Sequence, residues 1–223
     1  MHDLVYGNAI YRNPLASEQN VKSWQLEGKA AVSFPQRRLR IESVIPKEEG
    51  QKANYVLWCP KDFPDHVSFS WDFYPVREPG LAMFWFAAKG RNGEEIFDSA
   101  HTKRTGEYQQ YHHGDINAFH ASYFRRGILN TMKVANLRKS YGFHLVAQGA
   151  DPIPSFFYNP PYHIEVIKRG PEMQFMINSL IIWYFKDDGT TFGPSLSSGK
   201  IGFRQMAPLV AEYANLVVRE VKV

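Results

Sequence analysis

The stretch from Tyr108 to Arg126 concentrates side chains that bind or react with polar ligands. Tyrosine rings stack on sugar rings, arginine pairs with carboxylates, and histidine moves protons near neutral pH. The stretch therefore predicts a site for a polar ligand, and it leaves open whether that ligand is only bound or also chemically changed. Its three histidines, three tyrosines, two arginines and one aspartate are His112, His113, His120, Tyr108, Tyr111, Tyr123, Arg125, Arg126 and Asp115.

Asn136 and Arg138 extend this set, because residues two apart share one face of a strand. Arginine and asparagine can neutralise a uronate carboxylate and so acidify its α-proton. A histidine or tyrosine then removes that proton, and a tyrosine can protonate the leaving oxygen. Exposed ion pairing is the alternative role for the arginines, and a half-buried, hydrogen-bonded imidazole is the alternative for His144. The candidate catalytic residues are Tyr123, Arg125, His112, His120 and His144.

The period of a strand limits which of these residues can meet. A regular strand would place Asn117, Tyr123 and Arg125 on one face and His120 on the other. His120 joins Tyr123 and Arg125 only if a bulge intervenes, and otherwise one of the other two candidate histidines must act.

A sugar site also needs aromatic platforms beside planar polar groups. Trp85, Trp183 and Tyr123 are candidate platforms, with core packing as the alternative for each tryptophan. Trp71 alternates with large apolar residues and is expected in the core. The candidate substrate-binding residues are Trp85, Asn117, Asn136, Arg138, Trp183 and Arg204.

Other chemistries fit the sequence less well. A retaining or inverting glycosidase needs two carboxylates across the scissile bond, and the Glu-x-Asp-x-x-Glu strand motif of jelly-roll glucanases is absent. His112 and His113 with Asp115, or Asp187 and Asp188, could touch a metal ion, but a loop surface and an Asx turn are the expected roles. We predict no metal and no cofactor.

The composition indicates one globular domain over residues 1–223. Hydrophobic residues make up 44% and aromatic residues 15%, which supplies a core and favours strands. The net charge of +4 is spread along the chain, and the basic run Arg37–Arg40 has no nucleic-acid-binding motif beside it. The single Cys59 excludes an internal disulfide. No signal peptide or membrane-spanning run is visible, so we expect a cytoplasmic protein that binds neither nucleic acid nor membrane.

Hydrophobic alternation predicts strands almost throughout, which indicates an all-β, two-sheet antiparallel β-sandwich of the jelly-roll type. The continuous apolar run Leu81–Ala88 is typical of a strand covered on both faces. The best short helix candidate is Asp115–Ser122. The loop-like segment from Gly149 to Pro161 is expected either to cross between sheets or to form a loop over a groove, rather than to separate domains. The predicted strands are 55–58, 69–74, 81–88, 132–137, 162–167, 173–177, 180–185, 200–206 and 213–221.

Several polar motifs in this chain resemble the uncharacterised bacterial YesU-like family. They lie in the same order along nearly the whole chain: Tyr11-Arg12-Asn13-Pro14-Leu15, Trp58-Cys59-Pro60, Lys103-Arg104-Thr105-Gly106, Gly114-Asp115-Ile116-Asn117-Ala118, Ser122-Tyr123-Phe124-Arg125-Arg126, Asn136-Leu137-Arg138-Lys139-Ser140 and Ile201-Gly202-Phe203-Arg204-Gln205-Met206. The resemblance implies a concanavalin A-like, galectin-like jelly roll. It also implies a setting of pectin or rhamnogalacturonan breakdown, without an established reaction or catalytic residue.

Three functional hypotheses follow. The first is a carbohydrate-active enzyme, of polysaccharide lyase or glycoside hydrolase type, whose sharpest form is elimination at a uronic acid. The second is a noncatalytic, lectin-like intracellular protein that binds pectin-type oligosaccharides. The third is an interaction protein whose groove is closed by a partner or by a second copy in a homodimer.

Overall fold

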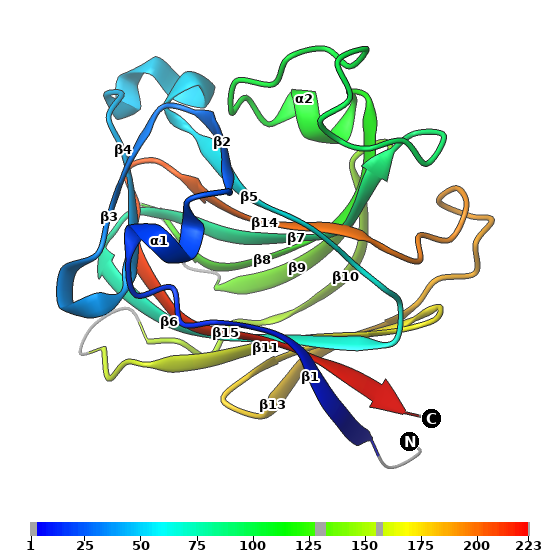
Figure 1. Cartoon of the computed structure of the whole chain (residues 1–223). Coiled ribbons are helices and arrows are strands. Elements are labelled where there is room, and N and C mark those ends of the chain that lie inside the picture. Colours follow the sequence, from blue (N-terminus) through cyan, green and yellow to red (C-terminus); the bar gives the residue numbers. More distant parts are fainter. Residues whose placement is uncertain (1–3, 128–132, 155–157, 223) are drawn as a thin grey trace.

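The computed structural model describes residues 4–127, 133–154 and 158–222 of the chain. Their strands form two antiparallel sheets that pack face to face, as Figure 1 shows. The two-sheet sandwich predicted from the sequence is confirmed. Met132, the first residue of one predicted strand, lies outside the described residues.

The sheet at the bottom of Figure 1, here called the back sheet, has eight strands in the order β13-β12-β11-β6-β15-β4-β3, with β1 also paired to β15. The first and last strands, β1 and β15, pair side by side in opposite directions. The strands of the back sheet are β1 (Val5–Asn13), β3 (Ala30–Ser33), β4 (Leu39–Ser43), β6 (Val67–Arg77), β11 (Tyr162–Arg169), β12 (Glu172–Ile177), β13 (Leu180–Lys186) and β15 (Val210–Lys222).

The other sheet, here called the front sheet, has seven strands in the order β10-β9-β8-β7-β14-β5-β2. The chain leaves it at β10 and enters the back sheet at β11, so the segment from Gly149 to Pro161 crosses between sheets as predicted; residues 155–157 of it lie outside the described residues. The strands of the front sheet are β2 (Gln25–Gly28), β5 (Tyr55–Phe63), β7 (Gly80–Gly90), β8 (Ile116–Arg126), β9 (Val134–Ser140), β10 (His144–Ala150) and β14 (Gly199–Met206).

Helices are few and short in the described part of the chain. They are α1 (Glu18–Val21), α2 (Gln109–His112) and the 3₁₀ segments η1 (Pro35–Arg37) and η2 (Lys47–Ala53). The loop that carries α2 lies over the outer face of the front sheet (Figure 1). The helix candidate Asp115–Ser122 is wrong, because Ile116–Arg126 is strand β8. The alternating residues Phe119 and Ala121 face the core there, and ladders to β7 and β9 bind both edges of the strand.

Aromatic rings from both sheets fill the space between them. Trp71 on β6 contacts Phe84 on β7 with 4.4 Å between ring centroids, and Phe73 meets Tyr123 at 5.1 Å. Burial of each such side chain contributes about 1.5–3 kcal/mol. The predicted core position of Trp71 is confirmed, and this packed layer gives the front sheet a rigid support.

Candidate functional site

The outer face of the front sheet carries a row of mostly polar side chains. The strand registers of β14, β7, β8, β9 and β10 align its members directly opposite one another, and Cβ atoms of such pairs lie about 4.5–5.5 Å apart. Across the sheet the row is Arg204, Met83, Ser122, Asn136 and Gln148. The Gln148 side-chain amide donates to Asn136 Oδ1 at 2.9 Å, which fixes the orientation of the Asn136 amide.

A second row lies two residues away along β14, β7, β8 and β9 and continues onto β5. Because residues two apart share a face, Asn136 and Arg138 both face outward, as the sequence predicts, and His120 lies beside Ser122. The members of this row are Trp58, Gly202, Trp85, His120 and Arg138.

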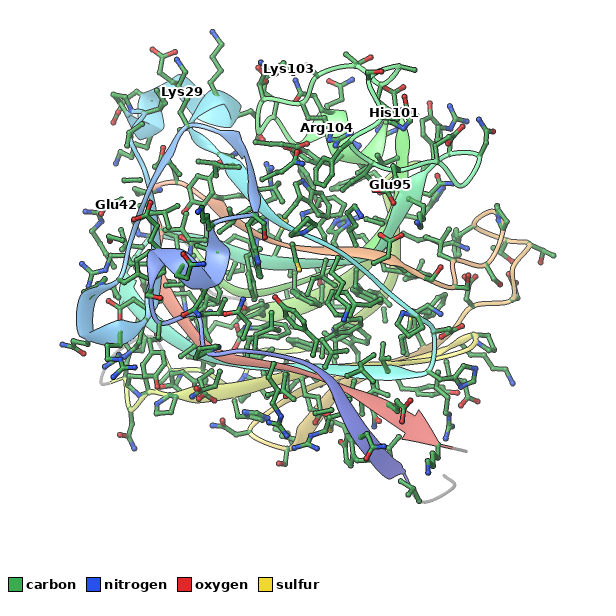
Figure 2. All side chains as sticks on the ribbon, in the orientation of Figure 1. Lys29, Glu42, Glu95, His101, Lys103 and Arg104 are labelled. Carbon is green, nitrogen blue, oxygen red and sulfur yellow. The ribbon has the colours of Figure 1, made fainter. Side chains whose placement is uncertain are left out.

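The loop between β7 and β8, which includes α2, covers one part of this face. Tyr111 of α2 packs on Trp85 with 5.6 Å between centroids, and Arg104 donates to Glu27 at 2.7 Å to tie the loop to β2. Figure 2 shows Arg104 and His101 in this loop, above the front sheet. Trp85 is fully buried as a result, so core packing replaces the platform role predicted for it.

The part of the face that the loop leaves open is a groove of about 580 Å³. Its polar lining consists of hydroxyl, amide and guanidinium groups, and no carboxylate lines it within residues 4–127, 133–154 and 158–222. The lining residues that matter for a ligand are Tyr108, Ser122, Arg125, Arg126, Asn136, Arg138 and Phe143.

Arg138 is the groove's half-buried cation. Its guanidinium lies 3.8 Å from the centroid of the Phe143 ring, and its NH1 donates to the Phe143 carbonyl at 3.0 Å. Loss of hydration on burial lowers the pKa of Arg138, and Arg125 lowers it further. In the described part of the chain no carboxylate comes within ion-pair distance of this guanidinium. An anionic ligand would therefore meet a positive charge that the protein itself leaves uncompensated.

Tyr108 and His120 form a hydrogen-bonded pair at the inner wall of the groove. The Tyr108 hydroxyl lies 2.5 Å from His120 Nε2. Burial lowers the pKa of His120 well below its ordinary value and raises the pKa of Tyr108 to about 12. At neutral pH the imidazole is therefore uncharged and the phenol protonated, so the Tyr108 hydroxyl can donate a hydrogen bond to His120 Nε2. Tyr108 reaches the groove, whereas His120 is fully covered behind it.

Arg204 holds the covering loop from below. It is fully buried, and its NH1 donates to the Gly106 carbonyl at 2.6 Å. Its guanidinium lies 5.0 Å from the centroid of the Tyr108 ring and 5.3 Å from that of Tyr111. Direct substrate contact, which the sequence predicts for Arg204, is therefore replaced by a positioning contact with Tyr108.

A bulge in β8 decides which side chains reach the groove. Phe124 has a positive φ of 52°, and the β7–β8 register shifts between Ala82–Tyr123 and Gly80–Arg126. Tyr123, before the bulge, faces the core with Phe119 and Ala121, and its hydroxyl accepts a hydrogen bond from Trp71 Nε1 at 3.1 Å. Arg125 after the bulge lines the groove on the same side as Ser122. The prediction that Tyr123 and Arg125 share a face is wrong. The sequence allowed for a bulge that would bring His120 to the face of Tyr123 and Arg125. The bulge is present, but it brings only Arg125 to the face of His120.

His112 lies at the end of α2, next to the groove. Its ring contacts Tyr108 and Phe143 at centroid distances of 4.8 Å and 4.7 Å. Burial, followed by the neighbouring His113, lowers the pKa of His112 to about 4. The two imidazoles also share a hydrogen bond through their Nδ1 atoms. His112 thus supports the groove wall as a neutral ring.

Comparison with known proteins places this architecture in a family. A family model described as "Domain of unknown function (DUF1961)" matches residues 8–218. The chain belongs to the DUF1961 family. It is 48% identical over 217 residues to the uncharacterised protein YesU of Bacillus subtilis (strain 168), covering 96% of each chain. The resemblance seen in the sequence is confirmed.

Solved structures confirm the fold of this DUF1961 chain. A Bacillus subtilis protein of unknown function with a galectin-like fold superposes with a TM-score of 0.92 at 46% identity, covering 98% of this chain and 99% of that one. The carbohydrate-binding module CBM66 from Bacillus subtilis shares the fold at a TM-score of 0.55 and 11% identity, covering 88% and 95%. The galectin-like jelly roll predicted from the resemblance is therefore established.

The remaining candidate residues of this DUF1961 chain lie away from the groove. Asn117 and His144 line a separate cavity at one end of the front sheet. Trp183 is buried in the core and stacks on Phe175 with 5.3 Å between centroids, so it offers no exposed platform. Neither direct groove contact nor a platform is available to these three side chains.

The sequence assigns no role to four residues that line the groove, of which Arg126 is one. Tyr108 belonged to the stretch singled out above but received no role, and Ser122 and Phe143 received none either. The two-residue spacing of Ser122 from His120 was a usable signal for a shared face. Phe143 lies in the β9–β10 turn, where nothing in the sequence pattern indicates its direction.

A metal site and a membrane-spanning helix each place requirements on the described residues. Among the described residues no three His, Cys, Asp or Glu side chains gather as a metal site would require. Asp187, one of the candidate ligands, instead pairs with Lys139 at 2.7 Å. None of the helices in the described ranges is both long and apolar enough to cross a bilayer.

Proposed function

We propose that this protein binds oligosaccharides that contain uronic acids, of the plant-pectin or rhamnogalacturonan type, in the groove on the front sheet. The observation that carries the proposal is the Arg138 guanidinium, which lines a groove without a carboxylate in the described part of the chain. A uronate carboxylate matches a guanidinium through two parallel hydrogen bonds.

The other groove residues support a sugar as the carrier of that carboxylate. Ser122 and the fixed amide of Asn136 offer donors and acceptors for ring hydroxyls. Tyr108 and the 43% exposed Phe143 offer ring surface for the apolar face of a pyranose. The fold shared with a carbohydrate-binding module agrees with this proposal.

Thermal unfolding with two matched ligands tests the proposal. A galacturonic-acid trisaccharide should raise the melting temperature, because a ligand that binds only the folded state stabilises it by mass action. The same trisaccharide with its carboxylates reduced to alcohols should produce a much smaller rise at equal concentration. Equal shifts with the two ligands would contradict recognition through the carboxylate.

A second candidate function is elimination at the bound uronic acid, and the Tyr108–His120 pair favours it. Tyr108 would pass its proton to His120 Nε2, and the phenolate would take the C5 proton of the uronate. The C4–O bond then breaks as a C4=C5 double bond forms, Tyr108 protonates the leaving oxygen, and His120 returns its proton to Tyr108. Burial opposes the first transfer, because it raises the pKa of Tyr108 and lowers that of His120. The charges of Arg204 and Arg138 stabilise the phenolate, but they also lower the pKa of His120.

The variant Tyr108→Phe separates binding from this reaction. It keeps the ring and removes only the hydroxyl, so affinity for the acidic trisaccharide should change little. Formation of the double bond, followed by its ultraviolet absorbance, should slow by at least about 100-fold, since positioned acid–base groups contribute roughly 10²–10⁴ in rate. Absence of the double bond with wild-type protein, together with retained binding, would leave the noncatalytic, lectin-like function.

Three further expectations from the sequence stay predictions. They are a single domain over residues 1–223, a cytoplasmic location and a homodimer.

A further inference from the structure

A second cavity, larger than the groove, lies at one end of the front sheet. It has a volume of about 850 Å³, within the range of roughly 300–1,000 Å³ typical of small-ligand sites. The loop after β7, the β9–β10 turn and the loop between β13 and β14 enclose it. The two long loops lie at the same end of the sandwich in Figure 1.

The charges of this cavity differ from those of the groove. Asp98, Asp115 and Glu94 line it together with the donors Arg91 and Asn117. Carboxylates of this kind repel an acidic sugar and accept hydrogen bonds from hydroxyl groups. A lining with both carboxylates and donors therefore suits a neutral, hydroxyl-rich ligand.

Part of the polar lining is unused. Ser140 lines the cavity and is 1% exposed, and its buried Oγ has no hydrogen-bond partner within the described residues. By contrast, both Glu94 oxygens are occupied by Asn92, and the Lys139 amine is occupied by Asp187 and the Gly193 carbonyl. A buried hydroxyl without a partner is uncommon, and this one belongs to a residue of the cavity wall.

Aromatic rings complete the cavity. Tyr141 is 42% exposed, and the Arg91 guanidinium lies 4.0 Å from its ring centroid. His144 packs on Phe192 at 5.1 Å between centroids on another wall. A ring that is held by a cation and still exposed offers surface for a sugar.

We propose that this second cavity binds a neutral sugar residue through Tyr141, Asn117 and the carboxylates of Asp98 and Asp115. The proposal rests on the proposed saccharide binding of the protein and adds a site of opposite charge preference. The cavity and the groove flank one turn, because Tyr141 lines the former and Phe143 the latter. An oligosaccharide that carries both uronic acid and neutral residues would therefore find a matching site on each side of the turn.

Tyr141 and Phe143 provide a matched pair of variants, since they are two residues apart and are 42% and 43% exposed. Calorimetric titration would use the acidic trisaccharide and its carboxyl-reduced form. Tyr141→Ala should weaken binding of the reduced, neutral form by at least about tenfold and change binding of the acidic form less than twofold. Phe143→Ala should weaken the acidic form and leave the neutral form unchanged.

Distinct outcomes separate this inference from the proposed function. The second site would be overturned if the neutral form did not bind wild-type protein, or if Tyr141→Ala weakened binding of both forms equally. In either case binding of the acidic form to the groove would still stand. Failure of the acidic trisaccharide to bind wild-type protein would overturn the proposed function instead. Asn117→Ala gives a second, milder variant if Tyr141→Ala lowers the melting temperature, and it should also weaken only the neutral form.

Discussion

Replacing Arg138 with alanine is expected to weaken binding of the acidic trisaccharide by about 30- to 100-fold. Hydrogen bonds to charged groups contribute about 1.5–3 kcal/mol each, and 1.4 kcal/mol corresponds to tenfold in affinity. Arg138 has no carboxylate partner among the described residues, so its removal breaks no ion pair in the free protein. The loss should therefore appear in binding, with little change in the melting temperature. Calorimetric titration at low and moderate salt measures it.

Two control variants sharpen this result. Arg37→Ala removes an exposed arginine of η1, far from the groove in sequence, and should leave the affinity within about twofold. Arg138→Lys keeps the charge but loses the two-point geometry, so its affinity should fall between those of wild type and Arg138→Ala. Equal affinities for wild type and Arg138→Ala would refute carboxylate recognition at this residue.

Replacing Asp151 with alanine is expected to destabilise the fold by about 3–5 kcal/mol, as is typical when one partner of a buried ion pair is removed. The Asp151 carboxylate has no solvent exposure and pairs with Arg126 at 3.3 Å. It also accepts hydrogen bonds from the Phe124 and Ile153 backbone amides at 2.7 Å and 2.9 Å. The carboxylate therefore holds the β8 bulge that directs Arg125 into the groove. Urea unfolding followed by fluorescence measures the change.

The exposed pair of Arg77 and Glu42 provides the comparison. Arg77 NH2 lies 2.8 Å from Glu42 Oε1, but the Arg77 side chain is 54% exposed and the Glu42 side chain 38% exposed. Glu42→Ala should therefore change the free energy of unfolding by less than about 1 kcal/mol. If Asp151→Ala costs no more than Glu42→Ala, the bulge does not depend on Asp151.

The sandwich could be predicted because its signals are local. Alternation in residues 69–74 and the apolar run Leu81–Ala88 each report the environment of one strand. β7 is buried on both faces as expected, because the α2 loop covers its outer side. The strand order and the face that carries the groove depend on pairings between distant segments, which one sequence does not display.

The site was located in the chain but its members were only partly identified. Asn136 and Arg138 were correctly placed on one face, since their spacing decides it. Arg125 does not share a face with Tyr123, because the bulge at Phe124 is held by Asp151, 27 residues further along the chain. The position of Tyr108 could not be predicted, because it depends on the buried Arg204, which lies far along the chain on another strand.

Calorimetric titration of the whole chain with the acidic trisaccharide and with its carboxyl-reduced form tests the central claim most directly. The groove account predicts that the acidic form binds at least about tenfold more tightly, and that this preference shrinks as salt is raised, since salt screens the carboxylate–Arg138 attraction. Because the second cavity is proposed to bind the reduced form, the same titration with Tyr141→Ala isolates the groove. Equal affinity of that variant for the two forms, or its tighter binding of the reduced form, would contradict carboxylate recognition in the groove.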